Sequence, residues 1–112
     1  MAKTNFVNSP YSRDALSLLG QLIREGRIAR QMTAAELCQR AGISRPLLYR
    51  IERGDPHCAI GAVFEVATIA GVPLFETEPS RLAERRAAHR EKLALLPKAV
   101  RHGAPQGVPD DF

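Results

Sequence analysis

Residues 33–54 read TAAELCQRAGISRPLLYRIERG, and this stretch decides the fold. Thr33 is followed three residues later by Glu36, which is the spacing of a capping box, because the hydroxyl and the carboxylate can each satisfy a free backbone donor. The capping box predicts a helix that begins after Thr33, and Gly42 allows the left-handed turn that ends this helix. Ser44 is a second N-cap, and Pro46 falls in a first helical turn, where a missing N–H costs nothing. The stretch therefore predicts two short helices joined by a tight turn.

The two helices must cross closely, so a small residue is needed inside the first of them, and Cys38 lies at that place. Apolar side chains are expected to supply the shared core: Leu37, Ile43, Leu48 and Ile51. In a reducing compartment Cys38 and Cys58 are expected to be packed thiols and not a disulfide. Cys58 beside His57 lacks the paired spacing of a zinc site, so the sequence predicts no metal.

Helical periodicity predicts three more helices and no strand longer than a few residues. The first begins at a cap on Ser12 or Asp14 and ends near Gln31. Another covers residues 60–70 and is nearly all apolar, so we expect it to be buried on most sides and to help form a subunit interface. The last begins after the Pro79-Ser80 signal and runs to about residue 96. The expected fold class is all-α, with about five helices.

The 112 residues are enough for one compact domain with tails. We expect an N-terminal arm over residues 1–11, a DNA-binding domain over 12–78, a basic helix over 79–97 and a flexible Gly- and Pro-rich tail over 98–112. No apolar run is long enough for a membrane span, and residues 1–10 lack the pattern of a secretory signal. The sequence therefore predicts a cytoplasmic protein.

Charge alternates along the chain, which carries 16 Lys and Arg against 12 Asp and Glu. Residues 24–53 hold seven arginines against three glutamates, a net charge of +4. Residues 55–80 hold four acidic residues and no Lys or Arg. Residues 81–102 hold seven Lys and Arg against two glutamates, a net charge of +5. Arginine suits forked contacts with phosphate and guanine edges. The pattern favours DNA as the partner over a membrane.

The stretch 33–54 strongly resembles the helix-turn-helix of the XRE family, to which the lambda-type phage repressors and Cro proteins belong, and the resemblance covers about residues 13–75. In that family the helix after the Gly turn enters the major groove of DNA. The resemblance makes five residues candidates for reading bases: Arg45, Pro46, Leu47, Tyr49 and Arg50. Arg45 and Arg50 can each grip a guanine through its O6 and N7 atoms.

Other positions are matched to phosphate contacts or to structure. Thr33, Ala34 and Ser44 match places that meet phosphates at helix N-termini, although Ala34 departs from the usual Gln, so one contact is expected to be missing. Arg40 and Arg53 are further candidate DNA contacts. Arg27 and Glu52 match a pair that commonly forms an ion pair between the first and third helices, and we interpret both as structural.

The sequence shows no nucleophile–base–carboxylate set and no phosphate loop, so it predicts neither an enzyme nor a cofactor. The segments 51–56, 60–67 and 74–75, the basic helix and the final Asp-Asp-Phe resemble the small HipB-like antitoxins, which partner HipA-type kinase toxins. That resemblance implies a homodimer that binds an inverted-repeat operator, represses its own operon and neutralises the toxin. The expected dimer interface comprises Val63, Phe64, Leu74 and Phe75. The expected toxin contacts are Arg85, Arg86 and Phe112.

Two alternatives stay open. One is a freestanding, prophage-type XRE regulator without a toxin partner. The other is a helical domain that binds only proteins, which the arginines of the third helix argue against. Arg85 and Arg86 are equally candidates for phosphate contacts, and the sequence does not choose between these roles.

Overall fold

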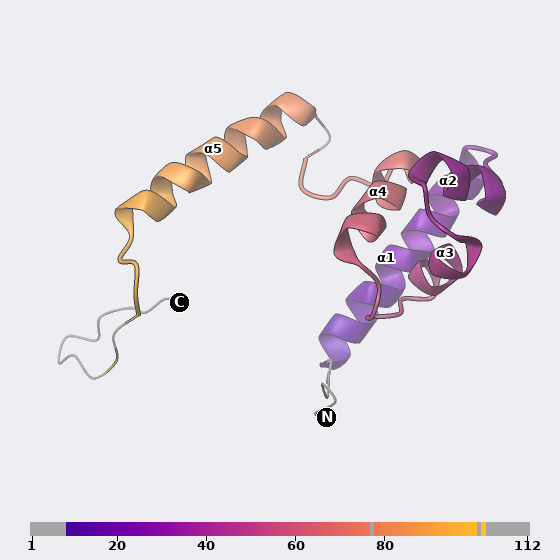
Figure 1. Cartoon of the computed structure of the whole chain (residues 1–112), viewed down its shortest axis with the longest axis horizontal. Helices are drawn as coiled ribbons and strands as arrows, with labels where there is room; N and C mark the ends of the chain where they lie inside the picture. Colours follow the sequence, from indigo (N-terminus) through magenta and orange to yellow (C-terminus); the bar gives the residue numbers. More distant parts are fainter. Residues whose placement is uncertain (1–8, 77, 101, 103–112) are drawn as a thin grey trace. The chain divides into compact units, whose positions relative to one another are not determined.

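The computed structural model describes residues 9–76, 78–100 and 102, and all regular structure in these residues is helical, which confirms the expected all-α class (Figure 1). The helices are α1 (Pro10–Ala29), α2 (Ala34–Ala41), α3 (Arg45–Glu52), α4 (Ile60–Ala70) and α5 (Pro79–Leu95). The chain divides into two compact units, residues 1–74 and 75–112. The first holds α1 to α4, and the second holds α5.

Helix α1 begins earlier than the sequence predicted. Ser9 is its N-cap, because the Ser9 hydroxyl accepts the Ser12 backbone N–H at 3.1 Å and Pro10 occupies the first turn. The prediction of a cap on Ser12 or Asp14 is therefore wrong. The helix also ends at Ala29, two residues before Gln31, whose φ of 56° is incompatible with a continuing α-helix.

Helices α1 to α4 share one core, to which each contributes one large, fully buried side chain: Ile23, Leu37, Leu48 and Val66. Of the residues expected in this core, Leu37, Leu48 and Ile51 are buried, whereas Ile43 is half-buried and packs against it. The backbone of α1 approaches α3 closely at Gly20, where a Cβ atom would lie 2.5 Å from the Glu52 carbonyl oxygen. Glycine is required there because any side chain would push α3 away.

Helix α4 is less covered than its composition predicted. Val66, Ala67 and Ala70 are buried, but Ile60 is 70% exposed and Phe64 is 36% exposed. The expectation that α4 is buried on most sides is wrong for the single chain, because α1 and α2 cover only one of its faces. Its other face is exposed to solvent and carries Ile60 and Phe64 together with Glu65 and Thr68.

In the second unit, no residue of α5 is buried. The Arg85 guanidinium donates to the Phe75 carbonyl oxygen at 3.5 Å and to the Glu76 carboxylate at 3.4 Å, and Arg81 also pairs with Glu76 at 3.8 Å. These bonds tie the helix to the segment that precedes it. Residues 1–8, 101 and 103–112, which include most of the expected arm and tail, lie outside the described residues.

Candidate nucleic-acid interface

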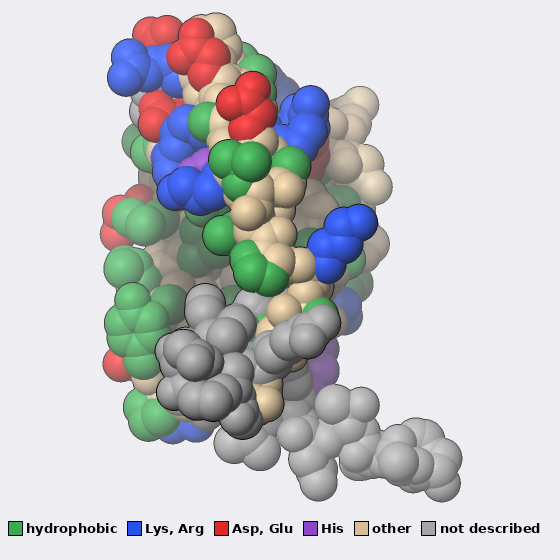
Figure 2. Space-filling view, turned by 90° about the vertical axis from the view of Figure 1, so that its left-hand side faces the viewer, with side chains coloured by type: hydrophobic (Ala, Val, Ile, Leu, Met, Phe, Trp, Pro, Cys, Tyr) green, Lys and Arg blue, Asp and Glu red, His purple; other side chains and the backbone are tan. Residues whose placement is uncertain are grey.

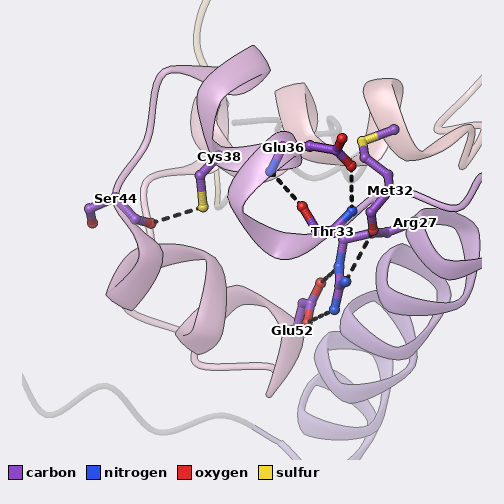
Figure 3. Close-up of polar contacts among 7 residues, drawn as sticks. All are labelled: Arg27, Met32, Thr33, Glu36, Cys38, Ser44 and Glu52. Atoms are coloured by element: carbon purple, nitrogen blue, oxygen red, sulfur yellow. Dashed lines mark hydrogen bonds and ion pairs between the residues drawn. The ribbon is translucent and has the colours of Figure 1, made fainter.

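The turn between α2 and α3 fixes the angle of the two helices. Gly42 has a φ of 71° and its N–H donates to the Cys38 carbonyl oxygen at 2.8 Å, while the Ile43 N–H donates to the same oxygen at 3.1 Å. The Cys38 thiol donates to the Ser44 carbonyl oxygen at 3.6 Å (Figure 3). Burial raises the pKa of the Cys38 thiol, and nearby Arg45 acts in the opposite direction. Cys38 is thus a packed, protonated residue that closes the turn.

Helices α2 and α3 each have an exposed, capped N-terminus. At α2, the Thr33 hydroxyl accepts the Glu36 N–H at 3.0 Å and the Thr33 N–H donates to the Glu36 carboxylate at 2.8 Å, so the capping box forms (Figure 3). At α3, the Ser44 hydroxyl accepts the Leu47 N–H at 3.3 Å. Both hydroxyls can still donate their own proton to a phosphate oxygen. Ala34 has no such group and is half-buried at the start of α2.

Helix α3 separates its residues into a core side and a solvent side. Leu48 and Ile51 are buried, and Leu47 is half-buried against the core. The other residues expected to contact DNA are exposed on α2 and α3 or at the α3 C-cap: Arg40, Arg45, Pro46, Tyr49, Arg50 and Arg53. Leu47 therefore offers less surface to a ligand than the other expected base readers.

Two of the exposed residues are held by neighbours. The Arg53 guanidinium lies over the Tyr49 ring, 4.7 Å from its centroid, which is a cation–π contact. The Arg50 Nε atom lies 3.6 Å from an Asp55 carboxylate oxygen. The exposed surface of α3 is therefore cationic and partly pre-arranged.

An ion pair between Arg27 and Glu52 joins α1 to α3. Arg27 Nε and one terminal nitrogen donate to the two Glu52 oxygens at 2.9 and 3.2 Å, and the other terminal nitrogen donates to the Met32 carbonyl oxygen at 3.3 Å (Figure 3). The side chains of Arg27 and Glu52 are only 13% and 10% exposed. Such a forked pair orients both partners, so these two residues position α3 and do not face a ligand.

The remaining expected site residues belong to other segments of the chain. Val63 and Phe64 are on α4, and Leu74 is half-buried at the end of the first unit. In the second unit Phe75, Arg85 and Arg86 are exposed. Phe112 lies outside the described residues.

Sequence reasoning missed two residues next to α3, Asp55 and His57. The Asp55 carboxylate accepts the His57 backbone N–H at 2.8 Å, which makes a local turn after α3. The signal was the position of Asp directly after the helix-ending Gly54, because Asp in a turn accepts a backbone N–H two residues on.

Across the described residues, no three His, Cys, Asp or Glu side chains come together in a way that could hold a metal ion. In the same part of the chain, no helix is both long and apolar enough to cross a membrane.

Comparison with known proteins gives one family assignment. The family model of a helix-turn-helix domain matches residues 18–79, which is more than half of the chain and includes the larger part of α1 and all of α2 to α4. Neither the curated proteins nor the solved structures contain a significant match. The matched range covers the capped turn, the exposed arginines of α3 and the Arg27–Glu52 pair described above. The chain therefore belongs to the helix-turn-helix domain family.

Proposed function

We propose that this chain is a sequence-specific transcriptional repressor that inserts α3 into the major groove of operator DNA. The observation that carries the proposal is the exposed cationic face of α3, held in place by the partly buried Arg27–Glu52 pair. A helix of this kind presents its N-terminal residues to base edges while the neighbouring helix contacts the backbone. The family assignment supports DNA binding.

Each exposed residue has a chemical role in this proposal. Arg45 and Arg50 contact guanine edges, with Pro46 and Leu47 packing beside them. Tyr49 contacts a thymine methyl group or a phosphate.

The remaining cations and helix ends bind the DNA backbone. Arg40 and Arg53 pair with phosphates, and Arg53 is already positioned by its stacking on Tyr49. At the capped helix ends, Thr33, Ala34 and Ser44 present backbone or hydroxyl donors to phosphate oxygens.

The functional unit that we propose is a homodimer bound to an inverted repeat. Its support is the exposed face of α4, on which the apolar side chains of Ile60 and Phe64 are accessible to solvent in the single chain. The expected interface combines Val63, Phe64, Leu74 and Phe75. A two-fold dimer would place its two copies of α3 in successive major grooves about 34 Å apart.

The test of DNA binding is a selection from a random-sequence DNA library with the purified full chain. An inverted repeat should emerge, and the logarithm of its binding constant should fall steeply with the logarithm of the salt concentration. Recovery of no common sequence, together with affinity that is independent of salt, would contradict the proposal. Sedimentation of the free protein and of Phe64→Glu tests the dimer, because a charge at that interface should yield monomers.

A second candidate function adds a protein partner, the kinase toxin of a toxin–antitoxin pair. A specific observation favours a partner: α5 buries no side chain, and Leu93 in the helix and Leu96 at its C-cap are exposed together with basic residues that include Arg86. The face in Figure 2 likewise shows hydrophobic side chains exposed beside charged ones. Apolar groups with surrounding cations suit an acidic protein surface. The kinase toxin itself is the partner that the resemblance to HipB-like antitoxins implies.

The test of this partner is purification of the tagged full chain from its own cells, followed by mass spectrometry. We expect a kinase to accompany the wild-type chain and to be lost from Arg86→Glu, while Glu84→Gln, a neutralised acid on the same helix, retains it. A truncation after Lys98 tests the expected contribution of Phe112. Operator binding without any co-purified protein would instead support a freestanding regulator.

A further inference from the structure

The chain turns back on α3 immediately after that helix ends. Gly54 has a φ of 80°, and a Cβ atom on it would lie 2.9 Å from the Ser17 backbone of α1, so glycine is required at this place. The reversal brings the Asp55 N–H to 3.0 Å from the Arg50 carbonyl oxygen. Asp55 is therefore held next to the last turn of α3 by its own backbone.

The two oxygens of the Asp55 carboxylate have different partners. Oδ1 accepts the His57 backbone N–H at 2.8 Å and lies 3.4 Å from the His57 Nδ1 atom. Oδ2 lies 3.6 Å from Arg50 Nε, a distance at which the contact is an ion pair without a short hydrogen bond. The hydrogen bond from the His57 backbone N–H, above all, lowers the pKa of Asp55, so the carboxylate is charged at neutral pH.

The direction of the contact matters for Arg50. A guanidinium has five N–H donors in a rigid fork. The contact to Asp55 uses the Nε side, and the edge formed by the two terminal nitrogens can still make two parallel hydrogen bonds. Those two bonds are what recognition of guanine O6 and N7 requires.

We propose that Asp55 is a specificity-determining residue that positions Arg50, so that this arginine offers its terminal nitrogens to a guanine and not to the nearest phosphate. The inference rests on the proposed DNA-binding function. Two effects act together. Because the ion pair already restricts the orientations of the Arg50 side chain, less conformational entropy is lost when Arg50 binds a base. The fixed negative charge also repels phosphate, which disfavours sequence-independent contacts.

The test compares base preferences of the full chain and of Asp55→Asn in the same random-sequence selection. The amide keeps an oxygen that accepts the His57 N–H, so the turn is preserved while the ion pair is lost. Arg50→Ala first identifies the base position that Arg50 reads. We expect Asp55→Asn to lower the preference at that position about fivefold or more, and to raise affinity for non-cognate DNA up to about fivefold.

Two controls separate positioning from net charge. Glu25→Gln removes one negative charge from the exposed side of α1, and it should leave the base preference unchanged. In the Arg50→Ala background, Asp55→Asn should have no further effect at that position, since its partner is gone. Circular dichroism and the thermal midpoint verify folding, and Asp55→Ser, which also keeps an acceptor for the turn, replaces Asp55→Asn if the latter does not fold.

The outcomes are distinct. A preference in Asp55→Asn equal to that of the wild type would overturn the inference, and so would an equal loss in Glu25→Gln. A wild-type chain that selects no sequence would overturn the proposed function and, with it, this inference.

Discussion

The Arg27–Glu52 pair offers the sharpest test of how the interface is built. Glu52→Gln has nearly the same shape but removes the charge, and its amide puts an NH2 donor where one carboxylate oxygen accepted from Arg27. The Arg27 side chain, only 13% exposed in the wild type, keeps the Met32 carbonyl oxygen and one amide oxygen as acceptors. Removing one partner of a buried pair costs about 3–5 kcal/mol. Because some exposure and the Met32 bond remain, we expect a loss of about 2–4 kcal/mol in the free energy of unfolding.

That loss is a large fraction of the roughly 5–15 kcal/mol that stabilises a domain. It corresponds to a fall of about 10 °C or more in the thermal midpoint of a unit of this size. The assay is urea unfolding of the full chain followed by far-UV circular dichroism. Glu25→Gln is the matched control, since an exposed change of the same kind should stay within about 0.5 kcal/mol.

A double variant sharpens the comparison. Arg27→Met with Glu52→Leu replaces both charges by apolar groups, and it should recover most of the stability lost in Glu52→Gln, because the main cost of the single change is the unpaired charge. If Glu52→Gln costs less than about 1 kcal/mol, the pair behaves as a surface ion pair and our account of α3 positioning fails.

Four further outcomes are expected. Gly20→Ala should destabilise the first unit by several kcal/mol in the same urea assay, because its Cβ would collide with the carbonyl oxygen of Glu52. Arg50→Ala should weaken operator binding by about 1–3 kcal/mol and relax one base position, as measured by titration against the selected site. Because the pKa of Asp55 is lowered in the fold, the contribution of Asp55 to stability should be complete above the ordinary Asp pKa of about 3.9. It should be lost as the pH falls through the lowered pKa. The thermal midpoints of wild type and Asp55→Asn should therefore converge in acid. Iodoacetamide should alkylate Cys58 before Cys38 in the native chain and both equally fast in urea, because burial both shields the Cys38 thiol and raises its pKa. The contrary results would be unchanged stability in Gly20→Ala and unchanged base selectivity in Arg50→Ala. For the other two predictions they would be a difference in thermal midpoint between wild type and Asp55→Asn that does not vary with pH, and equal alkylation of Cys38 and Cys58 in the native chain.

Local chemistry explains why the central stretch could be predicted. The capping box of Thr33 and Glu36, the left-handed Gly42 and the Ser44 cap each depend on residues at most three positions apart, and each forms as expected. Periodicity placed α4 at residues 60–70 for the same reason. The arginines of α3 were candidate DNA contacts because the resemblance to the XRE family placed them at base-reading positions, and both are exposed in the structure.

Contacts between distant residues decided the rest. The start of α1 was missed because Ser9 and Ser12 are both possible caps, and only the folded helix selects one. The composition of α4 predicted burial, but how much of it is covered depends on how many neighbours α1 and α2 supply.

Sequence by itself determined the helices, the turn between α2 and α3 and the surplus of arginine, because these follow from short-range backbone chemistry and composition. Only the tertiary structure decided that the α1 backbone passes close to Glu52 at Gly20 and close to Gly54 at Ser17. The physical reason is that each of these approaches joins residues more than thirty positions apart, which no local pattern records.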